Sequence, residues 1–428
     1  MMKRFSKEES SWMLYDWANS AYSVIIMTAV FPLFFKAAAA ENGVSAADST
    51  AYLGYTIAAA TFILAMLSPV LGTIADYKGC KKRFFAFFFL IGVAGTAALA
   101  LIPGESWMLL LICYTISTIG FAGSNVFYDA FLVDVAAKER MNMVSARGFG
   151  LGYIGSTIPF LLSIAVILSA QAGVIPLSAQ TAGRIAFLIT AAWWGLFSIP
   201  LLRRVRQRYY IEREPRLVVS SFKRLAGTLK QIRKYRALFL FLLAYFFYID
   251  GVGTIITMST SYGADLGISA ANLLIILFVT QVIAAPFSIL YGRLAERFKG
   301  KTMLYAGIGV YMIVCTYAYF MDSAFDFWVL AMLVATSQGG IQALSRSYFA
   351  KLVPKQHANE FFGFYNIFGK FASIIGPLLI AVTAQLTGNS SAAVFSLILL
   401  FVIGIAILAF VPEENSADIS QQQNDLPL

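Results

Sequence analysis

The chain contains about twelve long apolar runs, each near the ~20 residues that a helix needs to cross a membrane. Hydrophobic residues make up 59% of the 428 residues and charged residues 13%. The runs are long and rich in Leu, Ile, Phe and Ala, whereas the strands of a transmembrane barrel are short and alternate. They therefore predict an all-α polytopic membrane protein, with spans at roughly 13–36, 52–75, 84–102, 107–131, 146–170, 184–202, 237–261, 270–292, 303–321, 326–350, 361–385 and 391–411.

The basic residues are confined to alternate loops between these runs. The net charge of +10 could by itself suggest nucleic acid, but Lys and Arg gather near residues 3–7, 78–83, 138–147, 203–236, 293–301 and 351–355. The intervening loops carry mainly acids. Because cytoplasmic loops of membrane proteins are enriched in Lys and Arg, both termini are expected in the cytoplasm. We expect a multi-pass protein of a bacterial inner (plasma) membrane, with the lipid bilayer as partner and no nucleic acid.

The first apolar run is not expected to be a cleaved signal peptide, because it is too long and contains Asp16 and Asn19. The three cysteines have neither disulfide nor metal-site spacing: Cys80, Cys113 and Cys315. The single histidine, His357, is expected to be a solvated loop residue. No phosphate-binding glycine loop and no hydrolytic constellation is present, so we predict neither an enzyme nor a bound cofactor or metal.

The chain divides into two halves joined by one long hydrophilic stretch. We predict an N-terminal bundle at 1–202, a basic cytoplasmic linker at 203–236, a C-terminal bundle at 237–412 and a polar tail at 413–428. The linker is interpreted as an amphipathic helix on the inner leaflet, attracted by anionic lipid, with specific regulatory binding as the alternative. The halves repeat, since Asp129 aligns with Arg346, Pro159 with Pro377 and Asp16 with Asp250.

Several apolar runs carry polar or charged residues at helical spacing. A charge inside a bilayer costs at least ~2.5 kcal/mol on insertion scales, so such residues are candidates for a substrate or coupling site. The candidates, by run, are Asp16, Asn19 and Tyr22; Asn125 and Asp129; Asp250; Gln342 and Arg346; and Lys370.

Each charged candidate also has a structural alternative. Asp16 and Asp250 could lie at the cytoplasmic interface as caps or in salt bridges, and Lys370 could extend its ammonium to that interface. Asp129 and Arg346 could pair with one another across the bundle. Arg346 is expected to have an acidic partner, with Asp129 first and Asp16 or Asp250 as alternatives.

Two loops share a pattern of glycine, an acid four residues later and a basic cluster. The first contains Gly72, Asp76, Gly79 and Arg83, and the second contains Gly292 and Glu296. This pattern resembles the loops between helices 2 and 3 and helices 8 and 9 of the major facilitator superfamily. The resemblance implies twelve helices in two six-helix bundles, with helices 1, 4, 7 and 10 lining the path.

The same resemblance assigns partners to the two loop acids. In that architecture helix 2 meets helix 11 and helix 5 meets helix 8. Asp76 is therefore expected to engage the start of helix 11, and Glu296 the start of helix 5, where Arg147 is the available cation. These residues form the predicted gate.

Three strings narrow the resemblance: Tyr15-Asp-Trp-Ala-Asn-Ser-Ala-Tyr22, Gly340-Ile-Gln-Ala-Leu-Ser-Arg-Ser347 and Phe362-Gly-Phe-Tyr-Asn-Ile-Phe-Gly-Lys-Phe371. Over essentially the whole chain they resemble the vacuole-effluxer family of major facilitators, whose fungal members imply efflux of neutral amino acids. The resemblance predicts a secondary active transporter, working by alternating access, with an amino acid as the first substrate.

In this interpretation Arg346, with Lys370 as a second candidate, holds a carboxylate. Asp129 or Asp16 then meets an ammonium or carries a coupling proton, and Na⁺ coupling is open as well. We expect a monomer. The alternatives are a drug or metabolite exporter of the same fold, and a lipid flippase or non-transporting membrane scaffold.

Overall fold

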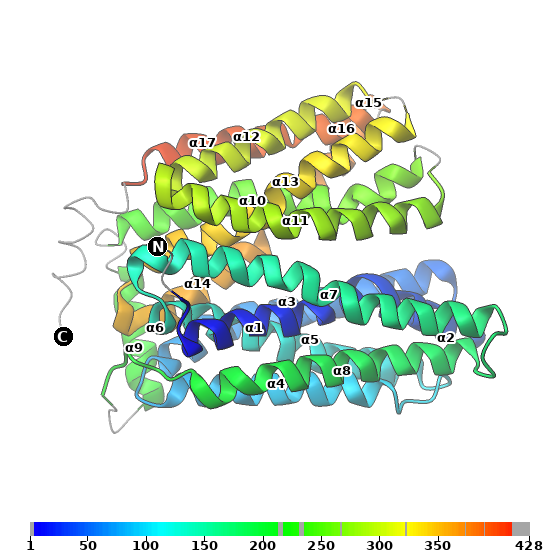
Figure 1. The fold of residues 1–428 in the computed structure, drawn as a ribbon, viewed down its shortest axis with the longest axis horizontal. Helices are drawn as coiled ribbons and strands as arrows, with labels where there is room; N and C mark the ends of the chain where they lie inside the picture. Colours follow the sequence, from blue (N-terminus) through cyan, green and yellow to red (C-terminus); the bar gives the residue numbers. More distant parts are fainter. Residues whose placement is uncertain are drawn as a thin grey trace.

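The computed structural model describes residues 4–212, 217–230, 235–265, 268–321, 323–372, 374–388 and 390–412. Within these ranges the chain is helical except for short connections and one β-bridge between Tyr77 and Ile211. Twelve helical segments of this described part are long and apolar enough to cross a membrane. The predicted all-α polytopic fold is confirmed (Figure 1).

The first half supplies six spans, coloured blue to green in Figure 1. Their helices are α1 (Lys7–Ala21), a π-helical segment (Tyr22–Ala29), α2 (Val30–Glu41), α3 (Ala46–Ala75), α4 (Cys80–Leu99), α5 (Trp107–Ala130), the short α6 (Leu132–Val135), a 3₁₀ turn (Lys138–Arg140), α7 (Met141–Gln171) and α8 (Ala179–Arg204). The first span is therefore interrupted, because α1 and α2 are joined by a π segment. Such segments are frequent at functional sites.

The second half follows the linker helix α9 (Leu217–Lys230). Its helices are α10 (Arg236–Asp265), α11 (Ala270–Phe298), α12 (Gly300–Tyr319), α13 (Ala324–Leu352), a 3₁₀ turn (Lys355–His357), α14 (Ala358–Phe371), α15 (Ile375–Thr387), α16 (Ser390–Ser396) and α17 (Ile398–Ala409). The eleventh span is divided between α14 and α15. Pro377, in the first turn of α15, lacks the N–H that a continuous helix would need. The predicted tail at 413–428 lies outside the described residues.

The two halves meet at one end of the molecule, which we call the terminal side because α1 begins and α17 ends there, at the left of Figure 1. Here α3 packs against α14, and α7 packs against α11 and α13. Away from this side, α2 packs mainly on α3, α5 and α8, and α15 mainly on α10 and α16. The two halves are thus in direct contact at the terminal side.

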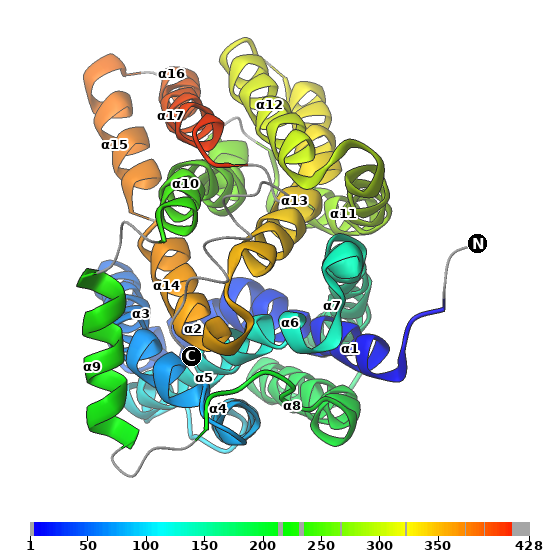
Figure 2. The same cartoon turned by 90° about the vertical axis from the view of Figure 1, so that its left-hand side faces the viewer.

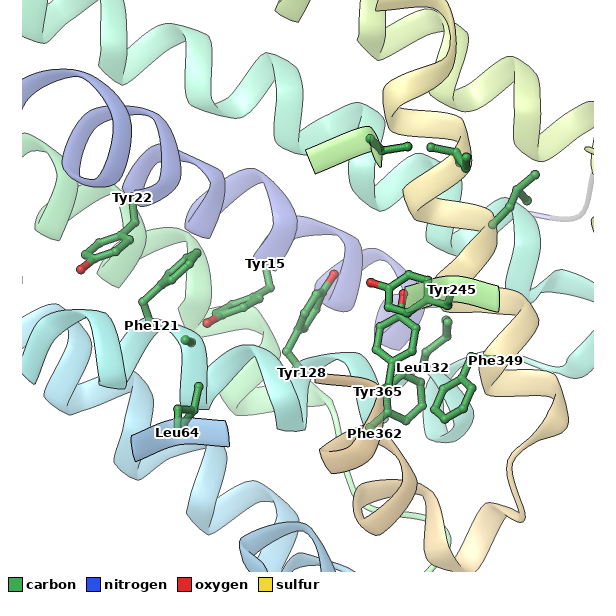
Figure 3. Packing of buried hydrophobic residues seen from close by; sticks show 14 of the residues in the cluster. Tyr15, Tyr22, Leu64, Phe121, Tyr128, Leu132, Tyr245, Phe349, Phe362 and Tyr365 are labelled. Carbon is green, nitrogen blue, oxygen red and sulfur yellow. The ribbon is translucent and has the colours of Figure 1, made fainter. Parts of the chain in front are cut away.

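A row of buried aromatic rings lines the region where the halves meet (Figure 3). Tyr15 and Tyr128 of the first half have ring centroids 4.5 Å apart, and Tyr245 and Tyr365 of the second half stack at 4.4 Å. All four side chains are largely inaccessible to solvent. Of these rings, that of Tyr128 contacts a charged residue described next.

Candidate transport site and gate

The guanidinium of Arg346 lies between the two halves. Arg346 lies on α13 and is buried. Its guanidinium carbon lies 4.6 Å from the ring centroid of Trp12, 5.5 Å from that of Tyr128 and 4.4 Å from that of Phe149. Aromatic faces attract a cation, and the attraction grows as water is removed. The rings therefore help to hold a charge that would otherwise be costly to bury.

Two acids of the first half bind this guanidinium. Arg346 Nη2 lies 2.9 Å from Asp16 Oδ2 on α1, and Nη1 lies 3.0 Å from Asp129 Oδ1 on α5. Arg346 also donates to the hydroxyl and the carbonyl oxygen of Ser145 on α7, at 2.9 and 3.2 Å. The predicted pairing with Asp129 is confirmed, Asp16 is a second partner, and Asp250 does not take part.

The cluster of Arg346, Asp16 and Asp129 holds one cation and two carboxylates. Their side chains are 4%, 10% and 17% exposed, so the most accessible of the three is Asp129. Packing around the cluster is tight, since a Cβ at Gly148 would collide with the Asp16 carboxylate. With both acids ionised, the cluster carries one uncompensated negative charge.

The remaining candidates of the first half complete a polar face beside the cluster. Asn19 donates to Asn125 Oδ1 at 2.7 Å, and the hydroxyls of Tyr22 and Thr118 lie 3.1 Å apart. The predicted stripes of the first and fourth spans therefore face one another. Gln342, half-buried on α13, donates to the carbonyl of Gln338 in its own helix.

The two remaining candidates of the second half lie near the break in the eleventh span. Asp250 on α10 is 1% exposed and accepts hydrogen bonds from the N–H of Gly376 at 2.9 Å and the hydroxyl of Thr254 at 3.3 Å. It holds the first turn of α15. Lys370, in the last turn of α14, forms no ion pair within the described ranges. Neither residue joins the Arg346 cluster.

The predicted contact of Asp76 with the eleventh span is present at the terminal side. Asp76 Oδ1 accepts from the backbone and side-chain N–H groups of Asn359, both at 2.8 Å, and Oδ2 accepts from the N–H of Glu360 at 3.3 Å. Asp76 thus binds the N-terminus of α14, where backbone N–H groups favour an anion. Gly72 permits this approach, because a Cβ there would collide with the carbonyl oxygen of Asn359.

Three further ionisable residues belong to this gate and were not predicted to do so. Arg224 of α9 lies 3.0 Å from both Asp76 Oδ2 and Glu360 Oε2, and His357 Nδ1 lies 3.8 Å from Glu360 Oε2. His357 is therefore half-buried in the gate, which corrects its expected place in a solvated loop. The sequence of α9 did contain an indication of this role. Ser221, Arg224 and Thr228 recur at helical spacing, and they lie on the face of α9 that packs against the protein.

The electrostatics of the gate follow from its burial. Burial raises the pKa of Asp76 to about 6, although Arg224 and the protonated form of His357 act in the opposite direction. Ligand atoms of Asp76, His357 and Glu360 lie within 4.8 Å of one another, a spacing that could also hold a metal ion. The guanidinium of Arg224 contacts both carboxylates of this group.

The second predicted gate contact is present in this conformation only as a longer-range charge interaction between Glu296 and Arg147. Glu296 is exposed and forms no ion pair with Arg147; the Arg147 guanidinium lies over the ring of Phe5, 4.5 Å from its centroid. The helices meet instead through small residues, because a Cβ at Gly292 would lie 2.5 Å from the Cβ of Ala146. The predicted role of this glycine in close packing is supported.

The two remaining candidates of the first loop, Gly79 and Arg83, lie at the start of α4. Gly79 adopts a φ of 73° at the start of α4 and donates its N–H to Gln207 Oε1 at 3.0 Å. Arg83 forms no ion pair within the described part of the chain. A buried pair that sequence analysis missed, Lys81 with Asp134 at 2.6 Å, anchors α4 to α6.

A family model for vacuole effluxers, "Vacuole effluxer Atg22 like", matches residues 5–420. The chain belongs to this family. It is 77% identical to the MFS-type transporter YxiO of Bacillus subtilis (strain 168), over the whole of both chains. It is 23% identical to autophagy-related protein 22 of Eremothecium gossypii, over 92% of this chain and 89% of the relative. The family is one of transporters and not of enzymes.

Solved structures show the same fold at low sequence identity. The transporter FucP in its outward conformation matches with a TM-score of 0.70 and 16% identity, over 95% of this chain and 98% of FucP. The proton:xylose symporter XylE matches with a TM-score of 0.71 and 14% identity, over 97% and 98%. The chain therefore has the major facilitator fold. Together with its spans and its 77% identity to an MFS-type transporter, this makes it a multi-pass integral membrane transporter.

Proposed function

We propose that this effluxer-family protein is a secondary active transporter that moves a small zwitterionic solute, with an amino acid as the first candidate, by alternating access. The observation that carries the proposal is the charge of the Arg346 cluster. One buried guanidinium faces two carboxylates from the other half. Buried charges need partners, so a solute with one carboxylate and one ammonium fits this set of groups.

Each group of the solute has a matching partner. Its carboxylate would bind the planar fork of Arg346, and its ammonium would bind Asp129, the more exposed of the two acids. Before the solute binds, a proton or Na⁺ would balance the uncompensated acid. Because a zwitterion brings no net charge, that cation would stay in the cluster and move with the solute, which couples the two movements.

The solute must also favour a change of conformation. A ligand that binds two conformations equally shifts neither. By replacing Asp16 or Asp129 on Arg346, the solute carboxylate would loosen bonds that now join α13 to α1 and α5. Loss of these bonds between the halves would supply the difference in binding free energy between the two conformations. The description of the family as vacuole effluxers supports efflux as the direction.

The test uses purified protein in liposomes and a thermal-shift screen of amino acids, peptides and drugs. We expect Arg346→Gln to lower amino-acid affinity at least tenfold and Arg346→Lys to restore it only in part, because the bidentate contact is lost. Lys355→Gln, at an exposed position, serves as the control. Unchanged affinity in Arg346→Gln would remove the proposal's main support.

One observation favours the drug-exporter alternative. The surplus carboxylate of the cluster could attract a lipophilic cation without any carboxylate on the solute. In that case Asp129→Asn would abolish binding while Arg346→Gln would leave it intact. The two variants therefore separate the two solute classes.

We also propose that the terminal side faces the cytoplasm of a bacterial cell, as the distribution of basic loops predicts. Cysteines placed at Ser45 and Gly388 should react with an impermeant reagent added to intact cells, and one at Gln207 should not. External labelling at Gln207 would reverse the orientation.

A further inference from the structure

The gate at the terminal side brings two acids from opposite halves close together. Asp76 belongs to the loop after α3, and Glu360 lies in the first turn of α14. Both side chains are essentially buried, at 1% and 0% exposure, and their oxygen atoms lie within 4.8 Å. Like charges at this distance repel, and the repulsion is screened little when the groups are buried. Alone, this pair would push the halves apart.

Arg224 converts this repulsion between Asp76 and Glu360 into a net attraction. Its Nη2 lies 3.0 Å from Asp76 Oδ2 and its Nε lies 3.0 Å from Glu360 Oε2. The same Nη2 donates to the carbonyl of Thr73, and the guanidinium lies over the ring of Tyr77. One cation therefore bridges two anions, each from a different half.

Arg224 lies on α9. This helix follows a linker segment that is hydrogen-bonded to the first half. Ile211 exchanges backbone hydrogen bonds with the 76–78 loop, at 2.9 and 3.0 Å. Gln207 donates to the carbonyl of Ala75 and accepts from Gly79. Helix α9 then packs along α3, beside α14, as Figure 2 shows from the terminal side. Arg224 thus reaches Glu360 from a segment associated with the first half.

We infer that the linker helix α9 is part of the gate: Arg224 joins Asp76 to Glu360 and thereby holds the terminal side closed. Opening requires the guanidinium to leave Glu360, so movement of α9 is coupled to each transport cycle. Arg224 acts as a gating residue and does not touch the solute site. The inference is independent of which solute the protein moves.

A metal ion is the rival for the same position. Asp76, His357 and Glu360 could offer it one nitrogen and two oxygen ligands. The guanidinium already contacts both carboxylates, so Arg224 and not a metal is the bridging cation in this inference.

The experiment measures the distance between spin labels at Ala137 and Gln356, which are exposed on opposite halves. The full chain, with its three cysteines replaced, is examined in lipid nanodiscs. We expect R224Q to lower the ratio of closed to open molecules at least tenfold, because it leaves two buried acids unpaired. R224Q/E360Q should return the ratio to within about twofold of the parent. K223Q, at the exposed neighbouring position, should not change it.

Two results would overturn the inference: a parent-like ratio in R224Q, or R224Q/E360Q as open as R224Q. If R224Q does not yield folded protein, E360Q is compared with R224Q/E360Q, and a tenfold difference between those two contradicts the repulsion argument. Opening of the parent by EDTA, reversed by Zn²⁺ alone, would assign the bridge to a metal. Failure of the amino-acid assays would leave these distances unaffected.

Discussion

The two junctions that close the terminal side are related by the internal repeat but held by different forces. Between α3 and α14, Asp76 binds a helix N-terminus and shares Arg224 with Glu360. Between α7 and α11, the backbones approach through Gly292 and Ala146, and the equivalent acid, Glu296, is exposed. The first is a charged junction and the second is a packed junction.

This difference indicates which of the two junctions can be regulated. The strength of a buried ion pair depends on protonation and on whether every partner is present. Packing between small residues depends on shape and changes little with pH. We therefore expect the charged junction to respond to pH and to α9, and the packed junction to act as the steadier contact about which the halves move.

The largest effect is expected from adding a methyl group to the charged junction. Gly72→Ala places a Cβ against the carbonyl oxygen of Asn359, a backbone atom that cannot turn away. We expect transport in liposomes to fall at least tenfold, because the gate cannot close fully. Gly309→Ala, where the added carbon meets nothing within 4 Å, is the matched control. Equal activities for the two variants would show that close approach is not required.

Lowering the pH from 7 to 5 should raise the closed-to-open ratio of the charged junction by up to about tenfold. Burial raises the pKa of Asp76 from 3.8 to about 6 in this closed form, whereas a solvated Asp76 in an open form keeps its ordinary value. The closed form therefore binds the proton more tightly, and the closed-to-open ratio rises as pH falls from 7 to 5. Spin-label distances between Ala137 and Gln356 report the ratio.

The other charged groups facing Asp76 are Arg224, Glu360 and His357. His357→Gln separates their contributions, since a protonated imidazole beside Glu360 would act in the same direction. If acid opens the terminal side of His357→Gln, the assignment to Asp76 is wrong.

Asp76→Asn should resemble the protonated acid. It keeps an oxygen to accept from Asn359 but gives up the charge that pairs with Arg224. We expect near-normal membrane insertion, transport about fivefold lower, and little pH dependence between pH 7 and 5. A variant with the same pH response as the parent would place the titrating group elsewhere.

The smallest effect is expected at the packed junction. Glu296→Gln removes an exposed charge that pairs with no residue in the described ranges, and such charges contribute little. Transport should change less than twofold. A loss comparable with that of Asp76→Asn would show that Glu296 pairs with Arg147 in another conformation and that the two junctions alternate in their use of charge.

The sequence by itself determined the class of fold and marked the charged residues that meet between the halves. Long apolar runs leave only helices in a bilayer, since each backbone polar group must be paired within its own segment. The cost of an intramembrane charge marked Asp16, Asp129 and Arg346, and the internal repeat suggested that the last two face one another. The structure confirms that contact.

Only the tertiary structure decided which charges share a partner. Arg346 binds Asp16 as well as Asp129, Asp250 holds α15, and Arg224 reaches from the linker to both halves. These contacts join residues more than 100 positions apart, and no helical period records which faces meet. The missing pair of Glu296 with Arg147 has the same cause, because a repeated motif fixes the position of a residue along its helix but not the side chain opposite it.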